Sequence, residues 1–391
     1  MLSLYTGPKL NGETKMAPST SFAGKATPPE LVERAVSELR RGSALVVYTE
    51  ANPQTALLVR AAETVDVWPP PFFNHKKVGA ITLAVTGRRA AVLGLSEPAA
   101  AAVELSFNQP VTPEFLRRLI GPSADELPTP PPGTTATLGA TNGVVSAVIL
   151  LTKIARLLPA AVIAPLSASD PQTWAQDANR ICVSARAIES YDRRAADELE
   201  PISNAHVPLA ACEDTRIISF RPKDGGAEHL AIIIGAPDSN KPVLTRLHSE
   251  CFTGDLLGSL RCDCGDQLRG AIEAIAKEGG GALLYLAQEG RGIGLVNKLR
   301  AYALQDQGFD TVDANEQLGF DDDERIYLPA VRMLRALGYS RVRLLTNNPA
   351  KVGALARHGI DVTERVPHVF PSNEHNQGYL QTKAKRSGHV F

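Results

Sequence analysis

The sequence predicts a two-domain protein of the α/β (α+β) class, and three observations support this prediction. The chain has 391 residues, which is too long for one ordinary globular domain. Hydrophobic residues make up 44% of it and charged residues 21%, which is typical of a chain with a substantial buried core. In both halves, segments with helical periodicity alternate with short apolar runs of strand length. We therefore expect helices packed on a sheet in each half.

The first half begins, after a leader at residues 1–27 that we expect to be flexible, with a helix from Pro28. A long apolar helix is expected over roughly 142–158, within an apolar stretch that Lys153 and Arg156 interrupt. Because of these charges, the stretch predicts a buried helix followed by a strand rather than a membrane span. Further strands are expected at 44–48, 78–85 and 90–95.

The second half starts near Ala205, after a polar stretch, which gives expected domains at 28–204 and 205–391. Its pattern is again of the α/β type. Strands are expected at 216–221, 229–236, 242–247, 281–287 and 341–346, and helices from about residue 265, over 297–306 and over 329–337.

The charge balance and the cysteines narrow the functional classes. With 41 basic and 42 acidic residues the formal net charge is −1, so we expect neither nucleic acid nor a membrane surface as a partner. The leader lacks the apolar core of a secretory signal, and we expect a cytoplasmic protein. In that reducing compartment, five cysteines predict metal ligands or buried thiols rather than disulfides.

Three of these cysteines, Cys251, Cys262 and Cys264, have the spacing C-x10-C-x-C. The last two precede a predicted helix, whose free N–H groups and dipole lower thiol pKa values. Soft thiolates favour Zn²⁺ among the metals common in a cytoplasm. Three thiolates leave one tetrahedral position for water, as in catalytic zinc sites, whereas His248 or Cys212 as a fourth ligand would make a closed structural site. The spacing alone leaves both interpretations open.

Several motifs of the second half resemble a known family in their order and separations. The motifs are Arg246–Gln267, Gln288–Gly294, Asn297–Asp306, Asp310–Asn315, Leu318–Phe320, Asp323–Arg325 and Leu345–Lys351. Through them, the chain from residue 205 onward closely resembles GTP cyclohydrolase II, the family that catalyses the entry step of riboflavin biosynthesis. The resemblance implies a domain with mixed sheets and a homodimer.

The resemblance also implies a reaction on GTP. The family opens the imidazole ring by hydrolysis, releases C8 as formate and cleaves diphosphate, which gives 2,5-diamino-6-(5-phosphoribosylamino)pyrimidin-4(3H)-one. The family's cysteines that match Cys251, Cys262 and Cys264 hold one zinc ion with the fourth position open. A zinc-bound water, whose pKa can fall to about 7, then supplies the nucleophile. Mg²⁺ is expected with the substrate triphosphate.

Diphosphate release needs separate groups. Arg325 matches a nucleophilic arginine of the family and Asp323 matches a carboxylate base, while Tyr302 matches a position near the metal. A guanidinium is normally cationic and a poor nucleophile. Arg325 could therefore stabilise charge on the phosphoryl group without a covalent step, and both roles stay open.

The substrate contacts are likewise implied by the resemblance. They are expected at Arg246, Leu247, His248, Ser249, Glu250, Gln267, Glu289, Gly290, Arg291, Thr311, Thr346 and Lys351. The amide of Gln267 can offer a donor and an acceptor to a purine edge. Gly290, Gly292 and Gly294 are expected to let the backbone approach the substrate.

Residues 30–200 faintly resemble a 3,4-dihydroxy-2-butanone 4-phosphate synthase, the domain that precedes such a cyclohydrolase in many bacteria. After its first strand, the synthase needs a dense acidic cluster that binds metal and sugar phosphate. Here the segment 48–55 contains one carboxylate, Glu50, which cannot assemble a divalent-metal site. We therefore predict a degenerate, non-catalytic domain that stabilises the dimer or positions the second domain.

Two other functions fit part of this pattern. A ring-opening relative that acts on another nucleotide, such as UMP in pyrimidine catabolism, would keep the zinc and change the contacts with the base. A non-catalytic, nucleotide-binding regulator would suit the degenerate first domain. The retained cysteines, Asp323 and Arg325 argue against the regulator.

Overall fold

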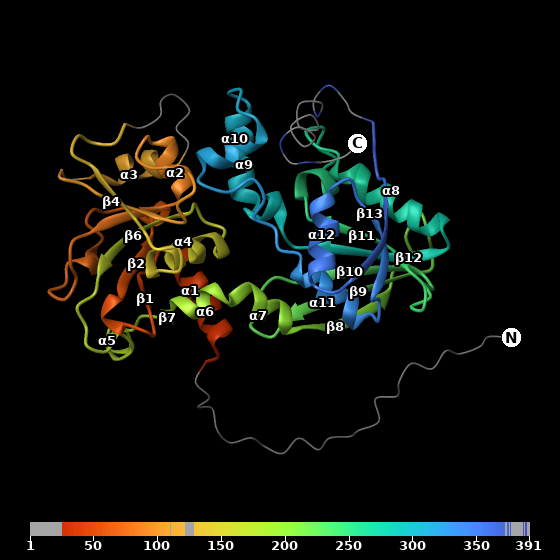
Figure 1. Cartoon of the computed structure of the whole chain (residues 1–391), viewed down its shortest axis with the longest axis horizontal. Helices are drawn as coiled ribbons and strands as arrows, with labels where there is room; N and C mark the ends of the chain where they lie inside the picture. Colours follow the sequence, from red (N-terminus) through yellow and green to blue (C-terminus); the bar gives the residue numbers. More distant parts are fainter. Residues whose placement is uncertain are drawn as a thin grey trace, which may run out of the picture.

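The computed structural model describes residues 26–109, 111–121 and 129–371, together with residues 374, 376, 386 and 388. Within these residues the chain forms two seven-stranded sheets, which lie side by side with their helices (Figure 1). The expected α/β class and the two-domain architecture are thereby confirmed. The expected leader at residues 1–27 lies outside the described residues except for its last two positions.

The first sheet is almost entirely antiparallel. Its strand order is β5-β4-β3-β6-β2-β1-β7, and the terminal pair of β1 with β7 is parallel. The strands are β1 (Leu45–Tyr48), β2 (Leu57–Ala61), β3 (Thr82–Val85), β4 (Val103–Ser106), β5 (Thr135–Leu138), β6 (Ala160–Pro165) and β7 (Cys182–Ser184). The helices are α1 (Pro28–Arg40), α2 (Gly87–Val92), α3 (Pro113–Ile120), α4 (Val144–Ile154), α5 (Pro171–Asp177), α6 (Ala185–Glu189) and α7 (Tyr191–Asp197).

The predicted strand at 90–95 is wrong, because this segment belongs to helix α2 and the turn after it. Thr86 caps the helix, since its side chain accepts the N–H of Arg89 at 3.1 Å. The Ala-Ala-Val run is short enough to fit the periodicity of a strand or of a helix, and the Thr86 cap stabilises the helix. The neighbouring strand β3 is shorter than expected, and Val78 forms only an isolated bridge with Leu166.

The second sheet is mixed, with order β14-β13-β11-β12-β10-β9-β8. Strands β12, β11, β13 and β14 pair in parallel, and β10, β9 and β8 continue the sheet in antiparallel fashion. The strands are β8 (Leu199–His206), β9 (Thr215–Pro222), β10 (His229–Gly235), β11 (Val243–Ser249), β12 (Gly280–Leu286), β13 (Arg341–Leu345) and β14 (Asp361–Val366). The helices are α8 (Cys264–Lys277), α9 (Leu295–Gln305), α10 (Thr311–Gln317), α11 (Leu328–Ala336) and α12 (Pro349–Arg357).

Strand β8 lies across the expected domain boundary at residues 204 and 205. It pairs with β9 from Leu199 onward and therefore belongs to the second sheet. We propose that the second domain begins at this strand and that α7 leads into it.

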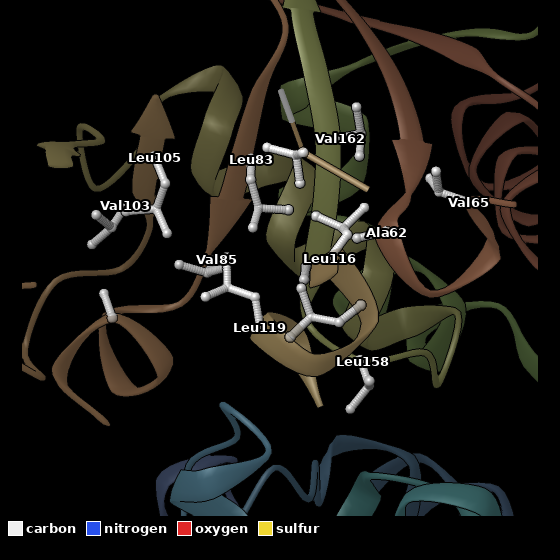
Figure 2. Packing of buried hydrophobic residues seen from close by; sticks show 14 of the residues in the cluster. Ala62, Val65, Leu83, Val85, Val103, Leu105, Leu116, Leu119, Leu158 and Val162 are labelled. Atoms are coloured by element: carbon white, nitrogen blue, oxygen red, sulfur yellow. The ribbon is translucent and has the colours of Figure 1, made fainter. Parts of the chain in front are cut away.

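The first sheet packs apolar side chains on both faces, and one of its two cores extends into the second domain. In β1, Val46 points to one cluster, whereas Leu45 and Val47 point to the other, as strand alternation requires. The cluster of Val46 also contains Leu318 and Phe320 of the second domain. Figure 2 shows its first-domain members, with Leu158 on the side that faces the ribbons of the second domain.

Among the residues that the structure describes, none of the helices combines the length and the apolar character that crossing a bilayer requires.

Candidate functional site

The predicted site residues gather where the parallel strands of the second sheet end. Strand β11 leads directly into Glu250 and Cys251, β12 into the segment 287–294, and β13 into Thr346. Parallel neighbours end at the same edge of a sheet, and ligands of α/β proteins commonly bind there. Residues that are a hundred positions apart in sequence therefore surround one site.

Cys251, Cys262 and Cys264 form a compact group of thiols. Their sulfur atoms all lie within 4.8 Å of one another. The Cys251 and Cys262 sulfurs are 3.7 Å apart. A tetrahedron with zinc–sulfur bonds of about 2.3 Å places its sulfurs about 3.8 Å apart. The spacing therefore fits one zinc ion with three sulfur ligands.

The chain passes so close to the thiols that only glycine fits at one position. After Cys251 it forms a π-helical turn, Phe252–Leu256, that brings Gly254 against the cluster. A Cβ atom at Gly254 would lie 2.8 Å from the Cys262 sulfur and 3.0 Å from the Cys251 sulfur. Such π-helical turns are frequent at functional sites. The turn forms a wall of the metal site and admits no side chain there.

The two residues considered as a fourth ligand lie outside the thiol group. His248 uses its Nε2 atom to contact the Asp255 carboxylate at 3.0 and 3.1 Å, and its ring stacks on Tyr285. Cys212 follows β8, and its sulfur lies 3.6 Å from the Asp214 carbonyl. Among the described residues, the group that could share a metal ion consists of the three thiols. A tetrahedral ion held by these three thiols alone would have one position for a non-protein ligand.

Contacts among the three thiols shift their pKa values in opposite directions. Hydrogen bonds with Cys262 and Cys264, together with the Lys298 ammonium, lower the pKa of Cys251. The hydrogen bond with Cys251 raises the pKa of Cys262 to about 11 and contributes most to raising the pKa of Cys264 well above its usual value. A bound metal ion displaces the thiol protons and removes the repulsion between the thiolates. The charge distribution of the cluster therefore favours a divalent cation.

Lys298 and Glu289 form a buried ion pair beside the thiols. The Lys298 Nζ atom lies 3.0 Å from the Cys251 sulfur and 2.9 Å from Glu289 Oε1. Burial opposes the ammonium charge, but these two anionic contacts outweigh it and raise the pKa of Lys298. Glu289 Oε2 accepts the backbone N–H of Phe252 at 2.7 Å. The pair thus fixes the segment after β12 to the start of the π-helical turn.

Two adjoining cavities open at this edge of the sheet. The thiol cavity, of about 110 Å³, contains all three cysteines, and the basic cavity, of about 70 Å³, lies beside it. Of the predicted residues besides Cys251 and Cys262, the thiol cavity is lined by Glu250, Glu289, Gly290, Tyr302 and Thr311, the basic cavity by Arg246, His248, Gln267, Thr346 and Lys351, and both by Ser249, Cys264, Arg291 and Arg325. The shared lining makes them two compartments of one site.

The basic cavity concentrates buried cations. Arg246 donates to the Leu345 carbonyl at 2.9 Å and also to the Gln267 side chain. Burial lowers the pKa of Arg246 to about 10, so it stays protonated at neutral pH. Lys351 donates to the Leu247 carbonyl at 2.9 Å. Because several cationic side chains line this cavity, it is suited to an anionic ligand, which they can bind with charge-assisted hydrogen bonds.

Asp323 and Arg325 are paired side to side. Arg325 Nε lies 2.7 Å from Asp323 Oδ1, and its second nitrogen lies 2.5 Å from Oδ2. Burial raises the pKa of Asp323, but the guanidinium outweighs burial and the pKa lies below its usual value. Arg325 lines both cavities, whereas Asp323 lines neither. In this geometry, the carboxylate orients the guanidinium from behind.

Arg291 is held in a strained backbone conformation between the cavities. Its φ angle is +61°, in the left-handed region that costs a non-glycine residue free energy. Its guanidinium donates to the Asp322 carbonyl at 3.2 Å. Such strain is common where a backbone must present a side chain to a ligand.

Leu247 and two of the glycines differ from expectation. The Leu247 side chain is buried in the core of the second sheet, so only its backbone faces the site. Gly290 lines the thiol cavity, as expected. A Cβ at Gly292 would instead meet the Glu324 carbonyl at 2.8 Å, and one at Gly294 would meet the Arg156 side chain at 3.1 Å. These two glycines are required by close packing against protein rather than by the substrate.

Eight lining residues were not singled out from the sequence. Asn347 and Asn348 line the basic cavity, and the thiol cavity is lined by Arg261, Ile293, Lys298, Ala301, Gln305 and Asn315. All eight lie inside the motifs on which the family resemblance depends. Their position within those motifs was the signal that could have identified them.

The carboxylate expected near the first strand of the first domain, Glu50, lies at the surface. Glu50 is exposed and lies 3.7 Å from Arg186. In the described part of this domain, the acidic, histidine and cysteine side chains form no group of three that could share a metal ion.

Comparison with known proteins locates the similarity. A family model described as GTP cyclohydrolase II matches residues 200–367. The GTP cyclohydrolase-2 of Azospirillum brasilense is 50% identical over 383 residues, covering 96% of this chain and 99% of that protein. A riboflavin biosynthesis protein of Bacillus velezensis is 53% identical over 177 residues, covering 45% of this chain and 44% of that protein. A two-domain 3,4-dihydroxy-2-butanone 4-phosphate synthase of A. baumannii aligns at 17% identity with a TM-score of 0.34, covering 81% of this chain and 93% of that one.

Proposed function

Because the chain belongs to the GTP cyclohydrolase II family, we propose that its second domain opens the imidazole ring of GTP by hydrolysis and releases formate and diphosphate. The observation that carries this proposal is the junction of the three-thiol cluster with the basic cavity. One compartment suits a metal and the other suits phosphate. The proposed product is 2,5-diamino-6-(5-phosphoribosylamino)pyrimidin-4(3H)-one, at the first step of riboflavin biosynthesis.

Zinc is the metal that the donor set favours. Cys251, Cys262 and Cys264 would hold it, because three soft thiolates at this spacing match its preferred ligands. When bound, zinc would act as a Lewis acid and make water a strong nucleophile at neutral pH. Burial raises the pKa of Tyr302, so its phenol stays protonated and can donate a hydrogen bond to the purine.

The cations around the basic cavity suit the phosphate groups of the nucleotide. Arg246 and Lys351 are buried there, and Arg291 and Arg325 reach it from the side of the thiol cavity. Guanidinium groups bind phosphate oxygens with charge-assisted hydrogen bonds. Mg²⁺ would accompany the triphosphate and neutralise part of its charge.

For diphosphate release, we favour a charge-stabilising role for Arg325. Arg325 donates two hydrogen bonds to the Asp323 carboxylate, which orients the guanidinium and suits the stabilisation of a developing negative charge. A nucleophilic arginine would first have to lose a proton. Asp323, placed behind Arg325, would act through that arginine rather than as a base on the substrate.

A homodimer and a cytoplasmic location complete the proposal. Leu256, Leu257 and Leu260 expose 70%, 66% and 58% of their surface beside the thiol cluster. Apolar side chains grouped in this way commonly mark an interface, and a second copy of the chain would cover them. The five cysteines are free thiols, as a reducing compartment would keep them.

We also propose that the first domain has no catalysis of its own. Its isolated carboxylate, Glu50, supports this. The full chain, incubated with ribulose 5-phosphate and Mg²⁺, should release no formate above the background without enzyme. Appreciable turnover would overturn this part of the proposal.

The central test is product analysis by mass spectrometry after incubation of the full chain with GTP, Zn²⁺ and Mg²⁺. Formate, diphosphate and the pyrimidinone product should form together and in equal amounts. Turnover of UMP in preference to GTP would instead indicate a ring-opening enzyme of pyrimidine catabolism. Bound zinc and bound GTP without formate would indicate a regulator.

A further inference from the structure

The first domain touches the catalytic loops directly. Contacts come from Lys153 near the end of α4 and from Arg156 just after it. They reach the segment 287–294, which carries Glu289 and Arg291, and the segment 321–325, which carries Asp323 and Arg325. The contacts are therefore made with the loops that line the site and not with a distant surface.

Lys153 is bound to the loop beside the Asp323–Arg325 pair. Its Nζ atom lies 2.6 Å from Glu324 Oε1 and 3.6 Å from Asp321 Oδ2. The side chains of Lys153 and Glu324 expose only 18% and 19% of their surface, so solvent screens this pair weakly. The backbone N–H of Glu324 in turn donates to the Arg291 carbonyl at 3.0 Å. One lysine of the first domain thus restrains both catalytic loops.

Arg156 holds the beginning of the other loop. Its guanidinium donates to the Ala287 carbonyl at 2.8 Å, while the Ala287 N–H donates to His229 Nδ1 at 3.0 Å. Ala287 is therefore fixed from both sides, once by each domain. The Arg156 carbonyl accepts the Asn297 side chain at 3.1 Å, which adds a bond to helix α9. Gly294 leaves the space that the Arg156 side chain occupies.

The backbone of Arg156 turns at the end of helix α4. Its φ angle is +56°, in the left-handed region that commonly follows the last residue of a helix. The N–H of Arg156 donates to the Lys153 carbonyl at 2.8 Å, and the N–H of Leu157 donates to the Thr152 carbonyl at 3.1 Å, which closes the helix. The contacts with Ala287 and Asn297 then bind the side chain and the carbonyl of Arg156 to the second domain.

We propose that Lys153 and Arg156 are positioning residues of the cyclohydrolase site, so that the first domain completes the active site without chemistry of its own. This inference rests on the proposed function of the second domain. Lys153 acts through Glu324 on the loop of Asp323 and Arg325, and Arg156 acts through Ala287 on the loop of Arg291. Displacement of reacting groups by about 1 Å can cost a hundredfold in rate.

The test compares Lys153→Met and Arg156→Asn with matched controls in the full chain. Asparagine tolerates the left-handed conformation, so Arg156→Asn removes the guanidinium without adding backbone strain. Lys153→Arg keeps a cation opposite Glu324. Arg332→Met removes another contact between the two halves of the molecule, that of Arg332 with Asp197, and neither residue lines the thiol cavity or the basic cavity.

We expect Lys153→Met and Arg156→Asn to lower kcat for formate release by about tenfold to a hundredfold. The zinc content and the KM for GTP should change by less than about threefold, since the thiols and the buried cations remain. Lys153→Arg should recover most of the rate. Arg332→Met should leave kcat unchanged. An unchanged kcat in both positioning variants, or an equal loss in Arg332→Met, would overturn the proposal.

Hydrogen exchange of the segments 287–294 and 321–325 separates this inference from the proposed function. Exchange there should be faster in Lys153→Met than in wild type, and unchanged in Arg332→Met. If wild type fails to turn over GTP, the proposed function fails, while the exchange result still decides whether the first domain fixes these loops. Equal exchange in all variants would contradict the inference.

Discussion

The two domains are built on sheets of the same size, but they bury different kinds of side chains. In the described part of the first domain, Arg89 is the one buried charged residue. The second domain buries Arg246, Glu289, Lys298 and Lys351 at a single edge of its sheet. Burial of charge costs free energy unless a partner or ligand compensates. The contrast teaches that concentrated buried charge, rather than sheet size or core volume, marks the domain that performs chemistry.

The topology of the sheets explains the contrast. In the first sheet, the central strand β6 is antiparallel to both neighbours, so successive strand ends fall on opposite edges. In the second sheet, β11 is parallel to both neighbours, and three strand ends meet at one edge. Parallel pairing therefore collects polar loops that antiparallel pairing would disperse.

The exception in the first domain lies at its boundary with the second. Arg89 donates to the Leu119 carbonyl at 2.9 Å and to the Gly121 carbonyl at 3.1 Å. It also donates to the Gln317 carbonyl of the second domain at 2.6 Å. This buried guanidinium thus connects the two domains.

The largest effect is expected from replacing a thiol of the second domain, compared with replacing a thiol of the first. Cys262→Ser should lose zinc and formate release together, by more than about a hundredfold, because loss of an outer-shell partner alone costs 10- to 100-fold. Cys182→Ser is the matched control, since burial raises the pKa of Cys182 to about 12 and keeps it an inert thiol. Metal content by mass spectrometry and formate assays check both. A metal-free Cys262→Ser variant with normal turnover would contradict the proposed role of these thiols.

The next largest effect is expected from replacing Arg325, whose charge we propose to act on the substrate. Arg325→Ala should slow diphosphate release by about a hundredfold or more, as does removal of one preorganised donor in other enzymes, while the zinc content stays unchanged. Arg325→Lys should keep part of the rate if the residue stabilises charge, and none if it is a covalent nucleophile. Arg117→Ala, which removes a surface ion pair of the first domain, should change nothing. A diphosphate assay with GTP measures all three.

A smaller effect is expected from the charge beside the metal. Lys298→Met removes the ammonium 3.0 Å from the Cys251 sulfur, and the zinc affinity should fall by about 10- to 100-fold. Competition with a chelator measures this affinity. The exposed Lys277, at the end of α8, provides the control variant Lys277→Met, which should bind zinc like wild type. Equal affinities in the two variants would show that Lys298 does not support the thiolate.

The smallest effect concerns the boundary between the domains and depends on pH. Burial, together with the charge of Arg156, lowers the pKa of His229 to about 4. Between pH 6.5 and 4, the unfolded chain therefore binds a proton that the folded chain excludes. The contribution of His229 to the free energy of unfolding is therefore complete above pH 6.5. It decreases as the pH falls toward 4, by roughly 3 kcal/mol at most.

Denaturant unfolding at pH 7.5 and pH 5 measures this loss. His229→Gln removes the titrating group but keeps an acceptor for the Ala287 N–H, so its stability should depend less on pH than that of wild type. Identical pH dependence in the two proteins would mean that His229 is not the titrating group.

The sequence predicted the local features of the fold and of the site. Helical periodicity located α1 and α4, and five strands of the second sheet lie close to the expected ranges, because each signal lies within one short segment. Strands β8 and β14, at the two edges of that sheet, were not expected. The thiol cluster was predictable for the same reason, since its spacing is local. The strand expected at 90–95 failed because a short apolar run fits two periodicities, and the Thr86 cap decides between them.

The features that depend on distant contacts were not predictable from periodicity. The pair of Lys153 and Glu324 joins residues 171 positions apart, and no repeat in the sequence indicates it. The basic cavity brings Arg246 of β11 next to Lys351 of α12 only because β11 and β13 are parallel neighbours. Gly292 and Gly294 were assigned to the substrate because a glycine-rich loop gives no sign of which surface it touches.

The apolar cluster that contains Val46, Leu318 and Phe320 has a consequence for how the molecule can be divided. A cut before β8 would leave Leu318 and Phe320 uncovered, and a contiguous apolar surface in water promotes self-association. The two halves should therefore melt in one cooperative transition and should not behave as interchangeable modules. Removal of the first half should expose these apolar side chains and make the remaining fragment prone to self-association.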